Sequence, residues 1–387
     1  MKPLAEKGAE KKVEYLELIY DLIFVYIIGR SNSMLHAVEN GFVGAETFLT
    51  YILSTLVILQ VWYYTTLFIN RYGVNGLQEH LCIFVNMYLL YYMADGTRVY
   101  WQDYYVRYNV AWGLILVNLA VQYLLKMRRS SGLAPWETDH MRYNMRLLLI
   151  QAAVVFATIP IYLVTHIPLG TAAMVFGILA ALLTGRTGRL MTVGFPHLTE
   201  RVMLYVVFTF GEMIIAVAGY FTGGFTLNSV YFSLMGFLIV VGLFSTYEYF
   251  YDHVIDRELT TTGTGYMMIH IFLIVALNNV TTVLEFMREP AVAEIPKHVF
   301  LVASIIGYFL FLFLLEKYAK VRARCGKQFM VRLLLLSIMF AGLMVVTYRR
   351  PAISIAVSVA YIFGVYGLLR IYGRSTVEGE MKCNPGS

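Results

Sequence analysis

Long apolar runs separated by short polar segments dominate the pattern along the chain. Runs of about 17 to 25 residues match the length of a bilayer-crossing helix, and the alternation of a transmembrane barrel strand is absent from the sequence. The pattern predicts an all-α, polytopic helical membrane protein with about twelve transmembrane helices. Their expected bounds are 17–35, 46–69, 80–95, 104–125, 145–165, 169–185, 200–220, 230–250, 266–286, 299–316, 330–347 and 352–370. The third and sixth are short, so a re-entrant or broken segment stays open for each.

Composition supports this interpretation. Of 387 residues, 59% are hydrophobic and 14% are charged, whereas about a quarter of the residues of an ordinary globular protein are charged. The lipid bilayer is therefore the expected environment. The net charge of +6 belongs to the loops, and no basic stripe is interleaved with exposed aromatic residues, so we expect no nucleic-acid partner.

The sequence lacks the usual marks of a metal centre or an active site. Cys82, Cys325 and Cys383 have no CxxC or metal-ligand spacing, which argues against a disulfide framework or a metal site. The sequence also lacks a nucleophile elbow, a nucleotide loop and a cofactor motif. We expect a protein that is not an enzyme and needs no cofactor.

Positive charge predicts the orientation. Lys and Arg collect on the cytoplasmic side of membrane proteins, and an inside amino terminus places most of the 30 Lys and Arg residues on inside segments. Residues 1–16 are expected to form a basic cytoplasmic segment and residues 373–387 a cytoplasmic tail. The first apolar run is interrupted by charge and lacks a cleavage signature, so it is expected to be an uncleaved helix.

The chain shows signs of two halves. Its strongest basic loops, 126–146 and 317–332, follow the fourth and tenth expected helices, which are equivalent positions in halves spanning 17–190 and 191–372. Parallel repeats of this kind would place a site between the halves. Shared membrane composition produces similar patterns, so duplication and common composition both stay open.

Ionisable residues interrupt the first apolar run, ELIYDLIFVYIIGR. Glu17 and Asp21 are four residues apart on one helix face, which Phe24 continues. Because charge inside a membrane is costly, such residues are functional candidates. We expect Glu17 at the headgroup level and Asp21, one turn deeper, as a paired interior carboxylate.

A second expectation joins opposite charges of the two halves. Arg30 lies about 20 Å beyond Glu17 along its helix, and Glu212 lies about 18 Å beyond Glu200 along another. Equal depth suggests an Arg30–Glu212 ion pair, while snorkelling of Arg30 is the alternative. Gly211 would let another backbone or a solute approach Glu212.

Polar residues of the second half complete the candidates. Asp252 and His270 flank one short loop and would form a proton relay near the inner mouth, although a surface-exposed histidine is the more common case. Asn278 and Asn279 lie in the middle of a span. They would either join helices by hydrogen bonds or coordinate a solute or cation.

Three blocks resemble the bacterial low-temperature-requirement A (LtrA) family. The string ELIYDLIFV is similar to that family's Glu-Leu-Phe-Phe-Asp-Leu-Val-Phe-Val, ERVMLYVVFTFGEMIIAV is similar to its Glu-Arg and Gly-Glu block, and YFYD is similar to its Tyr-Phe-Asp. The matching positions are Glu17, Asp21, Phe24, Glu200, Arg201, Gly211, Glu212, Tyr249, Phe250 and Asp252. This chain departs from the family pattern at two places. Arg30 stands where the family more often has an uncharged polar residue, and Ser33 stands near a position where the family commonly has His. The resemblance implies a multi-pass bacterial membrane protein.

The leading functional expectation is a secondary transporter or channel-like carrier in the bacterial cytoplasmic membrane, with proton coupling left open. It would move an unknown small solute or ion along Asp21, Arg30, Glu212, Asn278 and Asn279. Glu17, Asp252 and His270 would lie at the inner mouth of this path, and Tyr249 is a further candidate residue of the path. The alternative is a non-transporting sensor or an envelope stress-response factor that acts through a partner protein. Homo-oligomerisation is open for both.

Overall fold

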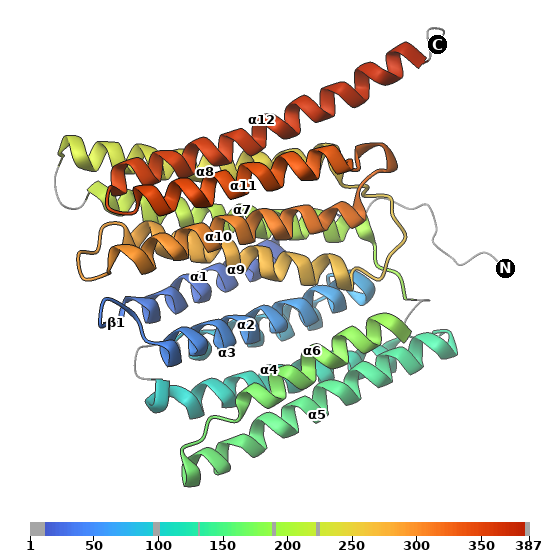
Figure 1. The fold of residues 1–387 in the computed structure, drawn as a ribbon. Coiled ribbons are helices and arrows are strands. Elements are labelled where there is room, and N and C mark those ends of the chain that lie inside the picture. Colours follow the sequence, from blue (N-terminus) through green and yellow to red (C-terminus); the bar gives the residue numbers. More distant parts are fainter. Residues whose placement is uncertain (1–11, 96–100, 131, 188–190, 222–224, 384–387) are drawn as a thin grey trace. The chain divides into compact units, whose positions relative to one another are not determined.

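Twelve α-helices make up nearly all of the computed structural model, which describes residues 12–95, 101–130, 132–187, 191–221 and 225–383 (Figure 1). They are α1 (Tyr15–Asn32), α2 (Ala45–Tyr72), α3 (Leu77–Asp95), α4 (Trp101–Arg129), α5 (Pro135–Thr165), α6 (Gly170–Thr187), α7 (Phe195–Ala218), α8 (Leu227–Tyr249), α9 (Thr264–Phe286), α10 (Glu294–Leu314), α11 (Lys327–Thr347) and α12 (Pro351–Cys383). The all-α prediction is confirmed. Most of the basic amino-terminal segment and the last four residues of the tail lie outside the described residues.

Ten of these helices, all except α3 and α6, are long and apolar enough to cross a membrane. In the part of α6 that the structure describes in full, a shorter apolar stretch covers Gly170–Ala180. These two helices are the ones whose apolar runs are short in the sequence. A polytopic membrane protein is therefore confirmed, and the count of twelve crossings stays a prediction.

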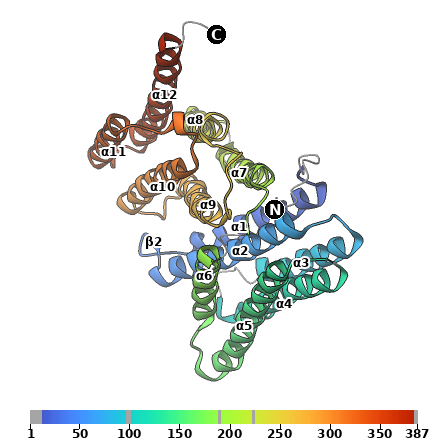
Figure 2. The same ribbon diagram turned by 90° about the vertical axis from the view of Figure 1, so that its right-hand side faces the viewer.

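The first of two compact units contains Met1–Met34, Glu46–Tyr205 and Arg257–Met268. Within it α3, α4, α5 and α6 pack in chain order, and α1 packs on α3. Figure 2 shows α4 and α5 side by side. Their approach depends on Gly113 of α4, because a Cβ atom there would lie 2.6 Å from the Phe156 ring of α5.

The second unit contains Leu35–Ala45, Val206–Asp256 and Ile269–Ser387. Here α12 packs against both α8 and α11, and α11 also contacts α10. The rings of Phe340 in α11 and Tyr361 in α12 stack at a centroid distance of 4.3 Å. The division into halves at residue 190 and the duplication stay predictions.

A short hairpin in the second unit, β1 (Val38–Glu39) and β2 (Phe42–Val43), follows the short 3₁₀ helix η1 (Ser33–His36). Asn40 and Gly41 have φ angles of 52° and 86°, the left-handed pair that a tight hairpin turn requires. The Gly41 carbonyl accepts a hydrogen bond from the Ala293 amide at 2.6 Å. The pattern of the sequence does not predict this hairpin, because its strands are only two residues long.

The helix α8 ends in a single π-helical turn, η3 (Phe250–Val254). Such turns add one residue to the helical repeat and frequently occur at functional sites. The amide of Ile255 closes this turn on the Phe250 carbonyl at 2.9 Å. Asp252, a candidate from the sequence, therefore lies in an irregular part of the helix.

Candidate functional site

Arg201, near the start of α7, is the centre of a buried charge network in the first unit. Its Nε and Nη2 donate to the two oxygens of Asp21 at 3.1 and 2.9 Å, and its Nη1 donates to Glu17 at 3.0 Å. Arg201 and Asp21 are fully buried, and Glu17 is 3% exposed. The fork geometry of a guanidinium suits this two-point contact with a carboxylate.

The helix α1 aims both carboxylates at the same guanidinium because they lie one turn apart. The expected paired interior carboxylate at Asp21 is confirmed, and its partner is Arg201. Glu17 is buried against Arg201, and its expected position at the headgroup level stays a prediction. It is buried because a second edge of the Arg201 guanidinium faces it.

The helix α2 supplies a further donor. The Trp62 indole nitrogen donates to Asp21 Oδ1 at 2.9 Å, and the Trp62 ring lies 4.6 Å from the Tyr205 ring. Beside Asp21 in α1 and about one turn after Trp62 in α2, the hydroxyls of Tyr20 and Thr65 are 3.1 Å apart. Asp21 thus receives three N–H groups, which offset much of the cost of burying its charge.

His197 forms the other end of this group. The Asn70 amide nitrogen lies 3.0 Å from His197 Nδ1 and donates to the Gly194 carbonyl at 3.0 Å. Because an amide nitrogen only donates, Nδ1 accepts and the ring proton lies on Nε2. That nitrogen is 3.4 Å from Glu17 Oε1, without a well-aligned hydrogen bond in the described part of the chain. We call Glu17, Asp21, Trp62, Asn70, His197 and Arg201 the Arg201 network.

The charges of the Arg201 network do not cancel when His197 is neutral. Glu17 and Asp21 carry two negative charges, and Arg201 carries one positive charge. One protonated carboxyl group would balance them. An unbalanced buried charge costs free energy. The stability of the Arg201 network therefore depends on whether one of its carboxyl groups holds a proton.

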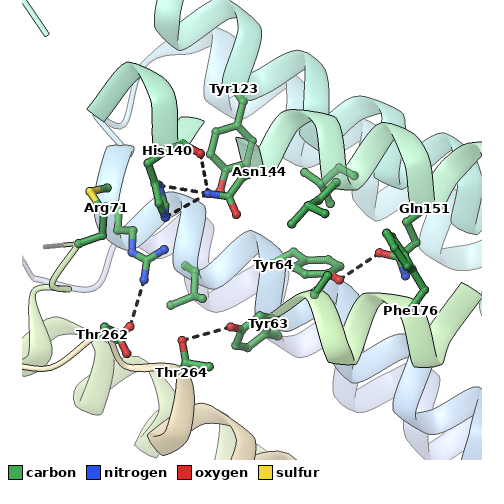
Figure 3. A pocket seen from close by; sticks show the side chains of 15 residues that line it. Tyr63, Tyr64, Arg71, Tyr123, His140, Asn144, Gln151, Phe176, Thr262 and Thr264 are labelled. Carbon is green, nitrogen blue, oxygen red and sulfur yellow. Dashed lines mark hydrogen bonds between the residues drawn. The ribbon is translucent and has the colours of Figure 1, made fainter. Parts of the chain in front are cut away.

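A small cavity of about 40 Å³ lies in the same unit (Figure 3). We call it the Arg71 cavity. Its walls are formed by Tyr63, Tyr64, Leu67, Arg71, Tyr123, His140, Asn144, Leu147, Leu148, Gln151, Phe176, Ala180, Met191, Thr262 and Thr264.

Polar groups line the Arg71 cavity on several helices. Arg71 Nη2 donates to the Thr262 carbonyl at 3.1 Å, and the Tyr64 hydroxyl donates to Gln151 Oε1 at 3.0 Å (Figure 3). Asn144 lies against His140, with its amide nitrogen donating to the His140 carbonyl at 2.9 Å. The cavity is thus polar and aromatic, with one permanent positive charge.

The helix α2 serves both places. Trp62 and Asn70 belong to the Arg201 network, whereas their neighbours Tyr63 and Arg71 line the cavity. Adjacent residues of a helix point about 100° apart, so one helix carries a charged face and a cavity face. A movement of α2 would therefore affect both.

Other candidates of the first unit have simpler surroundings. Phe24 is buried with its ring edge on Tyr20 at 5.0 Å. Arg30 is exposed, and Glu200 is partly exposed. Arg30 belongs to the first unit and Glu212 to the second, so their ion pair stays a prediction.

In the second unit, Glu212 is partly exposed. A Cβ atom on its neighbour Gly211 would meet no atom within 4 Å among the residues that the structure describes. The expected close approach of a backbone at Gly211 is therefore not observed. Tyr249 stacks on His253 at 4.8 Å, Phe250 is buried, and Asp252 is exposed.

His270 corrects one expectation. It is fully buried, and its Nε2 lies 3.2 Å from the Tyr247 hydroxyl, so the surface position common for histidines applies to His253 and not to His270. Burial follows from its place in the apolar start of α9. Its proton relay with Asp252 stays a prediction.

Asn278 and Asn279 of α9 lie beside threonines whose hydrogen bonds the structure defines. Asn278 is 2% exposed, and its amide nitrogen has no hydrogen-bond partner within the described ranges. Thr281 and Thr282 bond back to carbonyls one turn earlier in α9 at 3.1 Å each. These threonines satisfy their own helix, and solute contact by Asn278 or Asn279 stays a prediction.

Sequence reasoning missed several polar contacts. His36 lies 3.1 Å from Glu285 in the second unit, and Trp62, Arg71 and His197 had no role assigned. These residues are far apart in the sequence and come together only in the folded chain, so the sequence carries no signal that pairs them. No spacing rule connects His197 with Glu17.

The fold and these buried charges define a polytopic α-helical membrane protein with ionisable groups in its interior. The chain matches the family described as "Bacterial low temperature requirement A protein (LtrA)" over residues 12–365, and it belongs to this family. The comparisons with curated proteins and with solved structures gave no match. Both carboxylates of the first motif and the arginine of the second meet in one contact.

Proposed function

We propose that the protein is a membrane carrier for a small solute or ion, with proton coupling through the Arg201 network. The observation that carries this proposal is the buried network of two carboxylates, one guanidinium and a histidine. Intramembrane ionisable residues that face a protein interior typically mark ion or substrate pathways and proton relays.

A purely structural role explains the three buried charges of this network less well. Buried ion pairs replaced by apolar residues are often neutral or stabilising, so stability alone does not require three charges here. A charge balance that depends on one proton supports a group that titrates during function. The Arg71 cavity, on the other face of α2, is the adjoining place for a solute.

The proposal assigns roles to the candidates. Asp21 and Glu17 hold or release the proton, and Arg201 keeps the remaining charge balanced. Arg30, Glu212, Asn278 and Asn279 stay proposed members of the solute path in a bacterial cytoplasmic membrane. The alternative function, a sensor acting through a partner protein, predicts a partner recovered by crosslinking and no flux.

The test uses purified protein in proteoliposomes with a pH-sensitive dye inside. Nitrate serves as the probe because it is a small monovalent ion. Under an imposed nitrate gradient, the wild type should move nitrate together with protons, and Asp21→Asn should lose the proton component. The control is Asp139→Asn, because Asp139 is 72% exposed in a surface pair with Arg142. If folded Asp21→Asn and Glu212→Gln variants gave the same nitrate and proton fluxes as wild type, the proposal would fail.

A further inference from the structure

Arg71, which is partly buried, differs from the fully buried Arg201 of the same unit in having spare donors. One of its N–H groups donates to the Thr262 carbonyl at 3.1 Å. Its Nε is buried and has no hydrogen-bond partner within the described ranges. Buried donors are nearly always satisfied, so an unsatisfied guanidinium nitrogen indicates a missing acceptor.

The Arg71 cavity combines the positive charge of Arg71 with neutral polar groups. Among the residues that the structure describes, none that lines the Arg71 cavity is an aspartate or glutamate. Tyr63, Tyr64 and Asn144 contribute hydroxyl and amide groups to the walls, and Figure 3 shows them around the same space as Arg71. A cation enclosed in this way favours an anion from solution.

The size of the cavity limits that anion. A volume of about 40 Å³ holds about three water-sized bodies, since one needs about 10 to 15 Å³ by this measure. An ion of three or four non-hydrogen atoms fits, whereas a phospholipid headgroup does not. The single positive charge favours a monovalent ion, and the planar guanidinium fork favours paired oxygen atoms.

We infer that the Arg71 cavity binds a small monovalent oxyanion, of the class that includes nitrate, formate and bicarbonate. The anion accepts hydrogen bonds from the free Arg71 N–H groups and lies between the tyrosine and asparagine side chains of the walls. This inference deepens the proposed function, because it names the class of solute that the carrier would move.

Binding is measured on the full chain in detergent by isothermal titration calorimetry with sodium nitrate and sodium formate. The wild type should bind both saturably, and sodium sulfate, which is larger and divalent, should not compete. Arg71→Gln should weaken nitrate binding by about tenfold or more, because the charge-assisted hydrogen bonds are lost. Arg71→Lys, which keeps the charge without the fork, should weaken it less.

Arg142→Gln is the matched control, since Arg142 is half exposed and pairs only with Asp139 among the described residues. It should bind nitrate like wild type. A thermal unfolding curve of each variant without anion identifies any variant that fails to fold, in which case Arg71→Lys decides. Wild-type protein without saturable nitrate or formate binding, or equal affinity in folded Arg71→Gln, would overturn the inference and indicate a cavity that holds water only.

Failure here is distinguishable from failure of the proposed function. Nitrate binding that depends on Arg71, without flux in proteoliposomes, would refute the carrier and keep the site. Proton-coupled flux that Arg71→Gln leaves unchanged would keep the carrier and refute the site.

Discussion

Arg201 and Arg71 occupy one compact unit, yet their surroundings are opposite. Arg201 is fully buried, and its guanidinium meets two carboxylates. Arg71 has no carboxylate among the lining residues of its cavity, and its Nε lacks a partner in the described part of the chain. Arg71 is also only partly buried. The comparison teaches that the partners of a cation, together with its burial, determine whether it holds the fold together or is available to a solute.

The largest expected effect comes from removing the satisfied cation. Arg201→Gln leaves two buried carboxylates without their counter-charge, which should destabilise the protein by about 3 to 5 kcal/mol. Unfolding in mixed detergent micelles, followed by circular dichroism, measures the change.

The triple variant Glu17→Gln, Asp21→Asn, Arg201→Met removes all three charges and serves as its control. It should recover most of the lost stability, because the unpaired charges cause the loss. An equally unstable triple variant would show that packing at Arg201, and not charge, explains the effect.

A smaller loss should follow from removing one donor to Asp21. Trp62→Phe deletes the indole N–H group that donates to Asp21 at 2.9 Å, and a hydrogen bond to a charged group contributes about 1.5 to 3 kcal/mol. Trp112→Phe, at another fully buried tryptophan of the same unit, controls for the smaller ring. Equal losses in the two variants, measured by the same unfolding experiment, would remove Trp62 from the Arg201 network.

Arg71→Gln should change stability least among the buried-site variants. It deletes one hydrogen bond to a backbone carbonyl, and such bonds contribute about 0.5 to 1.5 kcal/mol. With nitrate present the gap to wild type should widen, because only wild type gains stability from a bound ligand. A gap that is independent of nitrate concentration in thermal unfolding would contradict the assignment of Arg71.

The exposed ion pair of Arg142 and Asp139 should give the smallest loss of stability among these variants. Arg142→Gln breaks the Arg142–Asp139 contact at 3.0 Å, whose partners are 49% and 72% exposed. Exposed pairs contribute about 0 to 1 kcal/mol. A loss as large as that of Arg201→Gln would mean that the unfolding experiment does not separate buried from exposed charge.

Sequence alone predicted the helical fold well, because apolar runs of membrane-spanning length leave few alternatives. The same pattern identified α3 and α6 as short. It missed the β1–β2 hairpin, since two-residue strands carry no periodic signal. It also gave Asp21 a buried partner without naming it, because Arg201 is 180 residues away along the chain.

The contrast between the two arginines was beyond the sequence. Arg71 follows one apolar run and Arg201 lies at the start of another. A hydropathy pattern therefore gives both arginines the same expected position, at the boundary of a membrane helix. Only packing shows that the carboxylates of α1 face Arg201, while Arg71 meets tyrosines, amides and the Thr262 carbonyl. The burial of Glu17 and His270 was missed for the same reason.

The central claim is that a charged network and an anion-binding cavity on the two faces of α2 make the protein a carrier. Nitrate flux into proteoliposomes, with proton movement recorded at the same time, tests it most directly. The account predicts coupled fluxes in wild type and Arg142→Gln, loss of nitrate flux in Arg71→Gln, and nitrate flux without proton movement in Asp21→Asn. Identical nitrate and proton fluxes in all four folded proteins would contradict it.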